Sequence, residues 1–152
     1  MQRAFLGFCV AVALVAAPLV SPAANATPGD PAVRHCSVTI LGEKESGELR
    51  ATEPECGRGA GKTEVLALDS GVIAVHYTAA NFTGSSLTIY GTSCTGGWLN
   101  MPTGWSDQIA STWSSCLVDH YDYFYLVGDL ETTGTPSNLY ALAYRTNSAQ
   151  YN

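Results

Sequence analysis

The chain has 152 residues, of which 7 are Lys or Arg and 13 are Asp or Glu, so its formal net charge is −6 at pH 7. This acidic balance argues against nucleic acid and anionic membrane as partners, because both repel a negatively charged protein. The length suits one domain, or a small domain with an appendage, and allows a real hydrophobic core.

Residues 1–26 have the pattern of a signal peptide. Arg3 provides the positive start, residues 4–20 are apolar, and residues 24–26 (Ala-Asn-Ala) offer a small-x-small cleavage site. Prolines interrupt the apolar stretch, which is also shorter than the roughly 20 residues that span a bilayer. The sequence therefore predicts a secreted, extracellular protein that has no membrane contact after signal cleavage.

Cleavage would remove Cys9 and leave four cysteines, for which an oxidising compartment favours two disulfides. Of the three pairings, we favour the one in which each bond closes a loop of about twenty residues and the loops do not cross, each worth roughly 3 kcal/mol. This pairing is Cys36–Cys56 with Cys94–Cys116. A zinc site is the alternative, but the C-x-x-C and H-x-x-x-H spacings that would indicate it are absent.

Residues 27–70 form a short N-terminal segment tied by its own disulfide. Within it, residues 36–41 alternate as a strand does, and residues 48–52 are able to return as the partner strand of a hairpin. Glycine dominates residues 57–62, which we interpret as a linker.

From residue 71 to residue 152 the chain is typical of an all-β protein. Segments rich in β-branched and aromatic residues occur at 72–77, 86–90, 117–125 and 139–144. Gly, Ser and Thr punctuate the sequence at short intervals, and no helix-period run with good caps is present. These features predict a β-sandwich.

One spacing of aromatic, Gly and Ser residues occurs twice. In each copy an aromatic residue precedes a large apolar residue by five positions and a glycine by seven, and a serine follows later. This spacing predicts a β-hairpin bent over its own sheet, in which the glycine adopts positive φ and the serine hydrogen-bonds the bend. Each copy would supply one four-stranded Greek key. The copies are Tyr77, Phe82, Gly84 and Ser111, and Tyr121, Leu126, Gly128 and Ser148.

The first copy follows the signature aromatic-x-x-x-x-aromatic-x-Gly, and Trp105–Ser111 largely follows Trp-(Asn/Asp)-Asp-x-Ile-(Ser/Thr)-Ser. By these motifs residues 71–152 resemble the βγ-crystallin superfamily, and especially its exported bacterial branch of secreted crystallin-fold metalloprotease inhibitors. The second copy departs from the pattern at Leu126, and residues 143–148 lack the acidic pair. The resemblance implies a βγ-crystallin-like sandwich of two Greek-key motifs with Trp105 at its interface. It does not extend to the N-terminal segment.

The resemblance also implies a position for calcium, because the family often builds a cation site from the turn that carries the final serine. Ser106 and Asp107 occupy the two leading ligand positions, and Ala110 stands where the family has a hydroxyl ligand. Calcium requires six to eight oxygen ligands, so the missing hydroxyl lowers the affinity. We expect no resident cofactor and a weak calcium site at most.

A second cluster combines carboxylates with one histidine, a composition found in catalytic and metal sites. Strand alternation would send Asp119 and His120 to opposite faces, and solvated charges at a sheet edge are the commoner outcome. We therefore interpret the cluster as surface charge, and each histidine as an isolated polar residue. No catalytic residue is predicted. The cluster comprises Asp119, His120, Asp122, Asp129 and Glu131, and the histidines are His35, His76 and His120.

The resemblance implies a non-enzymatic recognition protein whose partner is an extracellular protein, in its most concrete form a protease. The disulfide-closed stretch 94–102 is the predicted inhibitory loop, and the exposed aromatic residues offer a second candidate surface. Two alternatives stay open: a calcium-binding structural or stress crystallin, and an antagonistic toxin or cell-wall-binding protein. The loop contacts are predicted at Trp98, Leu99, Asn100 and Met101, and the second surface at Trp98, Trp113, Tyr121, Tyr123 and Tyr125.

Overall fold

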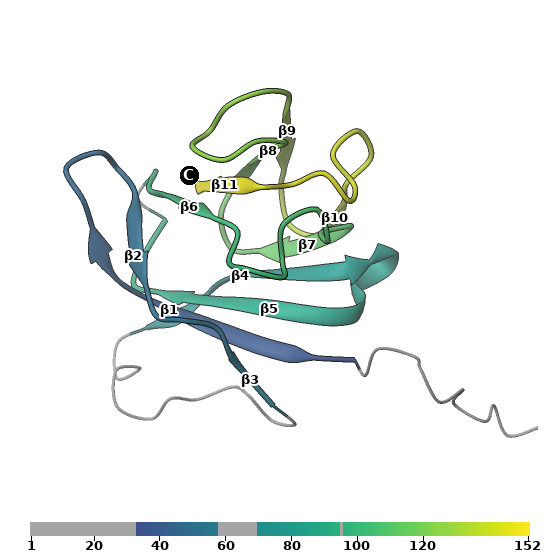
Figure 1. Ribbon diagram of the computed structural model, residues 1–152, viewed down its shortest axis with the longest axis horizontal. Helices are drawn as coiled ribbons and strands as arrows, with labels where there is room; N and C mark the ends of the chain where they lie inside the picture. The colour runs from purple at the N-terminus through teal and green to yellow at the C-terminus, as the bar shows by residue number, and fades with distance from the viewer. Residues whose placement is uncertain (1–32, 58–69, 95) are drawn as a thin grey trace, which may run out of the picture. The chain divides into compact units, whose positions relative to one another are not determined.

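Two β-sheets pack against each other as a β-sandwich, which confirms the predicted all-β class (Figure 1). The computed structural model describes residues 33–57, 70–94 and 96–152, all within one compact unit. The predicted signal peptide and most of the glycine-rich linker lie outside the described residues.

The described residues form short and medium strands joined by turns, with one 3-10 turn, η1. The strands in chain order are β1 (His35–Glu43), β2 (Leu49–Ala51), β3 (Glu55–Cys56), β4 (Gly71–Ala79), β5 (Thr83–Gly91), β6 (Trp98–Asn100), β7 (Ser111–Ser114), β8 (Val118–Tyr121), β9 (Leu130–Thr133), β10 (Ser137–Asn138) and β11 (Ser148–Tyr151), and η1 is Ala80–Phe82.

Residues 71–152 contain two halves, β4–β7 and β8–β11, and each half contributes one strand to the sheet that holds the rest of the other half. The larger sheet has the order β10-β7-β4-β5-β1-β2, with β3 also paired to β1, and the smaller sheet has the order β6-β11-β8-β9. Strand β6 lies in the smaller sheet, although β4, β5 and β7 lie in the larger one. Strand β10 lies in the larger sheet, although β8, β9 and β11 lie in the smaller one. Each half needs the other to complete a sheet, so the two halves fold as one core.

The described part of the N-terminal segment, residues 33–57, belongs to the larger sheet and is not an independent appendage. Strand β1 runs parallel to β5, from His35 opposite Ser86 to Thr39 opposite Tyr90. Strand β2 returns antiparallel to β1, and β3 pairs with the start of β1, where Cys36 lies opposite its disulfide partner. The segment therefore covers the edge that β5 would otherwise expose.

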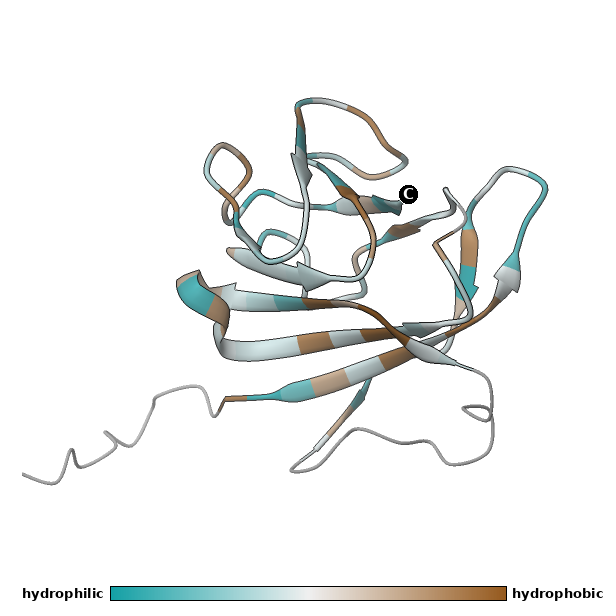
Figure 2. Ribbon diagram, turned by 180° about the vertical axis from the view of Figure 1, so that it is seen from behind, coloured by the Kyte–Doolittle hydropathy of each residue, from teal (hydrophilic) through white to brown (hydrophobic). Residues whose placement is uncertain are grey.

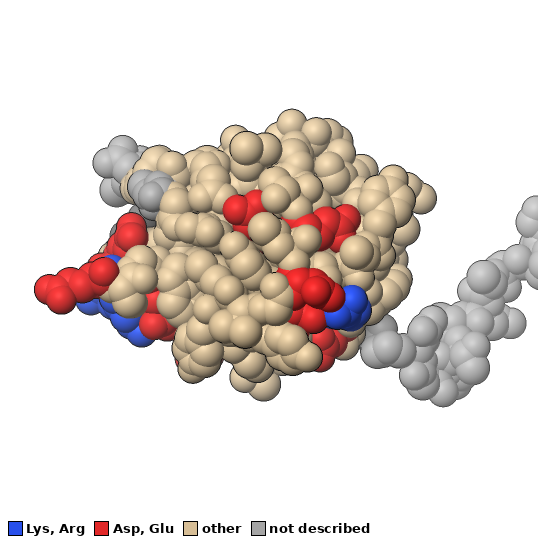
Figure 3. Space-filling view, turned by 90° about the horizontal axis from the view of Figure 1, so that it is seen from above, with Lys and Arg blue, Asp and Glu red and all other residues tan. Residues whose placement is uncertain are grey.

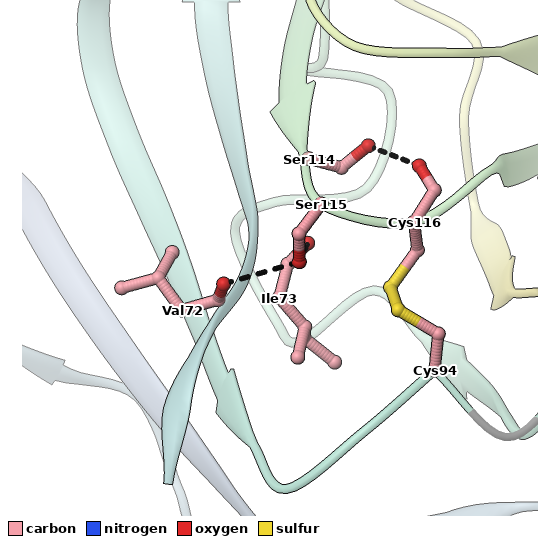
Figure 4. Close-up of a disulfide and its surroundings, with 6 residues drawn as sticks. All are labelled: Val72, Ile73, Cys94, Ser114, Ser115 and Cys116. Carbon is pink, nitrogen blue, oxygen red and sulfur yellow. Dashed lines mark hydrogen bonds between the residues drawn. A yellow bond between two sulfur atoms is a disulfide. The ribbon is translucent and has the colours of Figure 1, made fainter.

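The second disulfide joins Cys94, which follows β5, to Cys116 in the turn between β7 and β8 (Figure 4). Both pairings are those predicted from the sequence. The Ser114 hydroxyl donates to the Cys116 carbonyl at 2.6 Å, and the Ser115 hydroxyl donates to the Val72 carbonyl at 3.3 Å. The turn is thereby attached to β4 and to the connection that leads into β6.

The core lies between the sheets and follows the alternation of the strands. Apolar and polar bands alternate along the long strands of the larger sheet in Figure 2. In β5, Leu87 and Ile89 are fully buried and Thr88, between them, is on the opposite face. Trp105 is 1% exposed and belongs to this core. Fully buried apolar residues that surround these are Val38, Ile109, Val118, Leu142 and Tyr151.

Two predicted strands are shorter or absent. Strand β8 ends at Tyr121, and residues 139–144 form turns. The segment 139–144 is partly apolar because Leu142 is fully buried. The Tyr140 and Leu142 N–H groups donate to the Glu131 carboxylate at 2.8 Å each. A carboxylate thus replaces the ladder partner that a strand would require.

Candidate functional site

The connection between β4 and β5 is an arch held by a buried serine of β7. The Ser111 hydroxyl accepts a hydrogen bond from the Phe82 N–H at 3.1 Å and donates to the Ala79 carbonyl at 2.7 Å. Gly84 follows with φ +79°, and the rings of Tyr77 and Phe82 meet edge to face at 5.9 Å between centroids. The backbone of this arch is therefore fixed to the neighbouring strand.

The connection between β8 and β9 is a second arch with the same bonds. The Ser148 hydroxyl of β11 accepts from the Leu126 N–H at 3.1 Å and donates to the Tyr123 carbonyl at 2.7 Å. Gly128 follows with φ +94°. Leu126 stands where the first arch has an aromatic ring, yet the backbone bonds are unchanged.

An asparagine from the opposite half holds each arch a second time. The Asn138 side-chain oxygen, in β10, accepts from the Asn81 N–H at 2.7 Å. The Asn100 side-chain oxygen, in β6, accepts from the Tyr125 N–H at 2.9 Å. Each exchanged strand therefore contributes an asparagine side chain that hydrogen-bonds the backbone of the arch in the other half.

Left-handed backbone also occurs at equivalent positions of the two copies. In the first copy, Asn81 of the arch adopts this conformation, and so does Asp107, which lies four residues before Ser111. The second copy places tyrosines at both positions, Tyr125 and Tyr144. Asn and Asp tolerate this conformation best among residues with a Cβ, so backbone geometry does not account for the tyrosines. The described non-Gly residues with positive φ are Asn81, Phe82, Asp107, Tyr125, Leu126 and Tyr144.

The two arches differ most at their tips. In the first, Ala80, Asn81 and Thr83 are small or polar. Residues 123–127, which we term the aromatic arch, have the sequence Tyr-Phe-Tyr-Leu-Val and expose much of their apolar surface. The exposed fractions are 61% for Tyr123, 43% for Phe124, 66% for Tyr125 and 56% for Val127.

Trp98 supports the aromatic arch from the side. Its ring meets that of Tyr125 at 5.8 Å between centroids with an interplanar angle of 78°, and Phe124 meets Tyr125 at 6.5 Å and 61°. The Trp98 indole N–H donates to the Ser46 carbonyl at 3.3 Å. The β1–β2 hairpin thus fixes the indole, and the rings form a corner and not a flat platform.

Acidic side chains lie at the base of the aromatic arch. The Arg145 guanidinium bonds the Asp122 carboxylate at 2.6 Å and the Asp129 carboxylate at 3.1 Å. The hydrogen bond to Asp129 contributes most to raising the pKa of Arg145. Asp122 is nearly buried, whereas the Asp129 side chain is 74% exposed. Figure 3 views the side of the β8–β9 connection and shows carboxylates among uncharged surface, with cations towards two edges.

Asp107, one of the two predicted calcium ligands, has another partner. The Asn147 side-chain amide donates to the Asp107 carboxylate at 2.7 Å, and Ser106 is partly exposed beside it. Ala110 is buried and offers no oxygen. Within 33–57, 70–94 and 96–152, no three His, Cys, Asp or Glu side chains are grouped so that they would hold a metal ion.

Part of the predicted inhibitory loop, residues 94–102, is a strand, and the prediction requires correction at Leu99 and Met101. Trp98–Asn100 form β6, paired with β11, and Leu99 and Met101 are 8% and 3% exposed. Their side chains therefore contribute to the core and are not free to enter a protease cleft. Gly97 and Pro102 flank this stretch and suggest a loop. The alternation of side chains along the strand nevertheless directs Leu99 and Met101 into the core.

A buried polar cluster joins the two sheets, and the sequence reasoning missed it. His76 of β4 and His120 of β8 are fully buried, with 5.6 Å between ring centroids. His76 bonds the hydroxyls of Thr112 and Tyr151 at 3.0 Å each, and His120 bonds that of Thr133 at 3.1 Å. The second ring nitrogen of His120, Nδ1, has no hydrogen-bond partner.

Burial determines the protonation of this cluster. It lowers the pKa of His76 to about 4, and it lowers that of His120 well below 6.5, with a further decrease from the positive charge that His76 would carry. The prediction that these histidines are isolated is wrong. The predicted alternation is correct, since Asp119 is partly exposed and His120 is buried, but the sequence does not show that β4 brings a second histidine to the same place.

Each arch serine makes two bonds, so we expect Ser148→Ala to destabilise the protein by about 2 kcal/mol, because two backbone groups lose their partner. Ser111→Ala should have a similar effect, since its bonds have the same lengths. Thermal unfolding followed by circular dichroism measures both losses. Ser93→Ala, in an exposed turn, is the control and should leave the melting temperature unchanged. An unchanged melting temperature for both arch variants would contradict the role assigned to the serines.

The described part of the chain contains no helix long and apolar enough to cross a membrane. Comparisons with protein-family models, with curated proteins and with solved structures find no match to this chain.

Proposed function

We propose that this chain is a secreted, non-enzymatic recognition protein built on a βγ-crystallin-like sandwich of two Greek keys. Strands β4–β7 form the first key and β8–β11 the second. Two observations support this proposal. The hydrogen bonds from Ser111 and Ser148 to their arches have the same lengths in both copies, and β6 and β10 are exchanged between the sheets. The two disulfides suit the oxidising compartment that secretion implies.

The observation that carries this function is the contrast between the arch tips. Both tips have the same backbone bonds, but only the second exposes a run of aromatic residues, including Tyr125 in a left-handed conformation. Exposed Tyr and Trp side chains contribute strongly to protein interfaces. A pinned backbone also has little freedom to lose on binding, which favours affinity. The aromatic arch is therefore the recognition surface.

The concrete form of recognition is inhibition of an extracellular protease, which the family resemblance suggests. In this form the aromatic arch contacts the protease, whereas Leu99 and Met101 of the predicted loop are buried and do not. The arch follows β8, and the turn that precedes β8 is joined by a disulfide to the segment after β5.

A protease panel tests this function with a matched variant. In the arch-exchange variant, residues 123–127 are replaced by the sequence of residues 79–83, which adopts the same pinned backbone. We expect the parent protein to slow at least one metallo-, serine or cysteine protease at micromolar concentration, and the variant to be about 100-fold weaker, because several aromatic contacts are lost. If no protease is slowed, the inhibitor proposal fails. If both proteins inhibit equally, the arch is not the contact surface.

A calcium-dependent crystallin is the main alternative, and calcium titration separates the two. We expect about 1 mM calcium to raise the melting temperature by less than about 2 °C, because Asp107 is bonded to an amide and Arg145 is paired with two of the nearby carboxylates. Differential scanning calorimetry with and without a chelator measures the shift. A saturable rise of several degrees would favour the calcium-binding alternative.

A further inference from the structure

The aromatic arch lies in a stretch whose charged side chains are all carboxylates. Residues 117–131 contain no Lys or Arg. Arg145 is bonded at the base of the arch, where it is shared between two of these carboxylates, so the group remains net negative. The carboxylates are Asp119, Asp122, Asp129 and Glu131.

These carboxylates differ in how accessible they are to a partner. Asp122 is nearly buried and is bonded to the Asp129 N–H and to Arg145. Glu131 is bonded to two backbone N–H groups. Asp129 is 74% exposed and has a single bond to Arg145, at 3.1 Å. Asp129 is therefore more available to a second cation than Asp122 or Glu131.

The rings are a second feature of this surface that attracts cations. Trp98 and Tyr125 meet at 78°, so their faces point in different directions, and Tyr125 is 66% exposed. A cation is attracted to the face of an indole or phenol ring within about 6 Å of its centre. An ammonium or guanidinium group needs only one ring face, so perpendicular rings offer it two directions of approach.

We propose that the aromatic arch, together with Asp129, binds a Lys- or Arg-containing segment of the partner protein. This inference rests on the proposed function and adds the chemistry of the partner to it. Ring faces and a carboxylate both attract a guanidinium or ammonium group, and the surrounding carboxylates repel anionic surfaces. The overall charge of −6 would steer a basic partner towards the protein.

Two synthetic peptides probe this site directly. One alternates arginine with glycine, and the other has glutamate in place of each arginine. We expect the arginine peptide to quench tryptophan fluorescence and to bind with a dissociation constant below about 1 mM, while the glutamate peptide does not bind. Calorimetric titration of the same pairs provides an independent affinity. Affinity for the arginine peptide should fall as salt is added.

Three variants show whether the peptide binds at the arch. The arch-exchange variant should lose at least about tenfold in affinity, and Asp129→Asn about threefold. Glu53→Gln has the same change in charge on an exposed loop after β2, and should bind as the parent does. The proposal is overturned if the arginine peptide does not bind, or if all three variants bind it as the parent does, because then only net charge is involved.

These outcomes are separable from those of the protease panel. If arch exchange abolishes protease inhibition but no basic peptide binds, the recognition surface stands and its partner is not basic. If basic peptides bind at the arch and no protease is inhibited, the cation site stands and the inhibitor proposal fails.

Discussion

Gly128→Ala is expected to destabilise the protein by about 4 kcal/mol, because it combines backbone strain with the loss of a partly buried polar network. Gly128 has φ +94°, and an added Cβ would overlap the Asp122 carboxylate and the Tyr123 ring. Asp122 bonds the Asp129 N–H at 2.8 Å and Arg145 at 2.6 Å. Moving this carboxylate would release both partners at the base of the aromatic arch. Urea unfolding measures the loss.

Two other glycines provide the comparison. Gly134 has ordinary backbone, and an added Cβ would meet only the Leu117 side chain at 3.9 Å, so Gly134→Ala should be nearly neutral. Gly84 has φ +79°, and an added Cβ would come within 2.7 Å of the Thr78 hydroxyl, so Gly84→Ala should have an intermediate effect. A loss below about 1 kcal/mol for Gly128→Ala would show that the second arch is not rigid.

The two arches were predictable from sequence because their constraints are local. A glycine with positive φ, a large apolar residue two positions earlier and a distant serine define the bend, and the bonds of Ser111 and Ser148 follow the predicted spacing. The pairing of Cys36 with Cys56 was also predictable, since short loops limit the choice. Features encoded by a few residues can therefore be inferred from one sequence.

Long-range pairing was not predictable. The parallel alignment of β1 with β5 depends on contacts about fifty residues apart in the chain, for which the sequence contains no local signal. The burial of Leu99 and Met101 depends in the same way on pairing with β11. The aromatic arch was foreseen only as scattered tyrosines, because its significance appears when its tip is compared with the tip of the first arch.

Acidification below pH 6.5 is expected to destabilise the protein through the buried histidine pair. His76 has a pKa of about 4 in the folded protein, compared with 6.5 when unfolded, so the unfolded chain binds more protons between these values. The stabilisation by the neutral imidazole is complete above pH 6.5 and is lost as the pH falls towards 4. The loss is about 3 kcal/mol for His76 alone, and His120 increases it. Tyr151, which contacts His76, has a raised pKa and stays neutral throughout.

Urea midpoints at pH 7.5, 6, 5 and 4.5 test this dependence, with histidine variants as controls. The double variant His76→Gln/His120→Gln should show a flatter pH dependence whatever its absolute stability, because glutamine does not titrate. His35→Gln replaces an exposed histidine that bonds Ser86 at 2.8 Å and leaves the buried pair in place, so it should retain the parent slope. Equal slopes for the parent and the double variant would assign the acid sensitivity to other groups. The expected contrast follows from the position of the pair, since protonating either imidazole places an unpaired charge between two packed sheets.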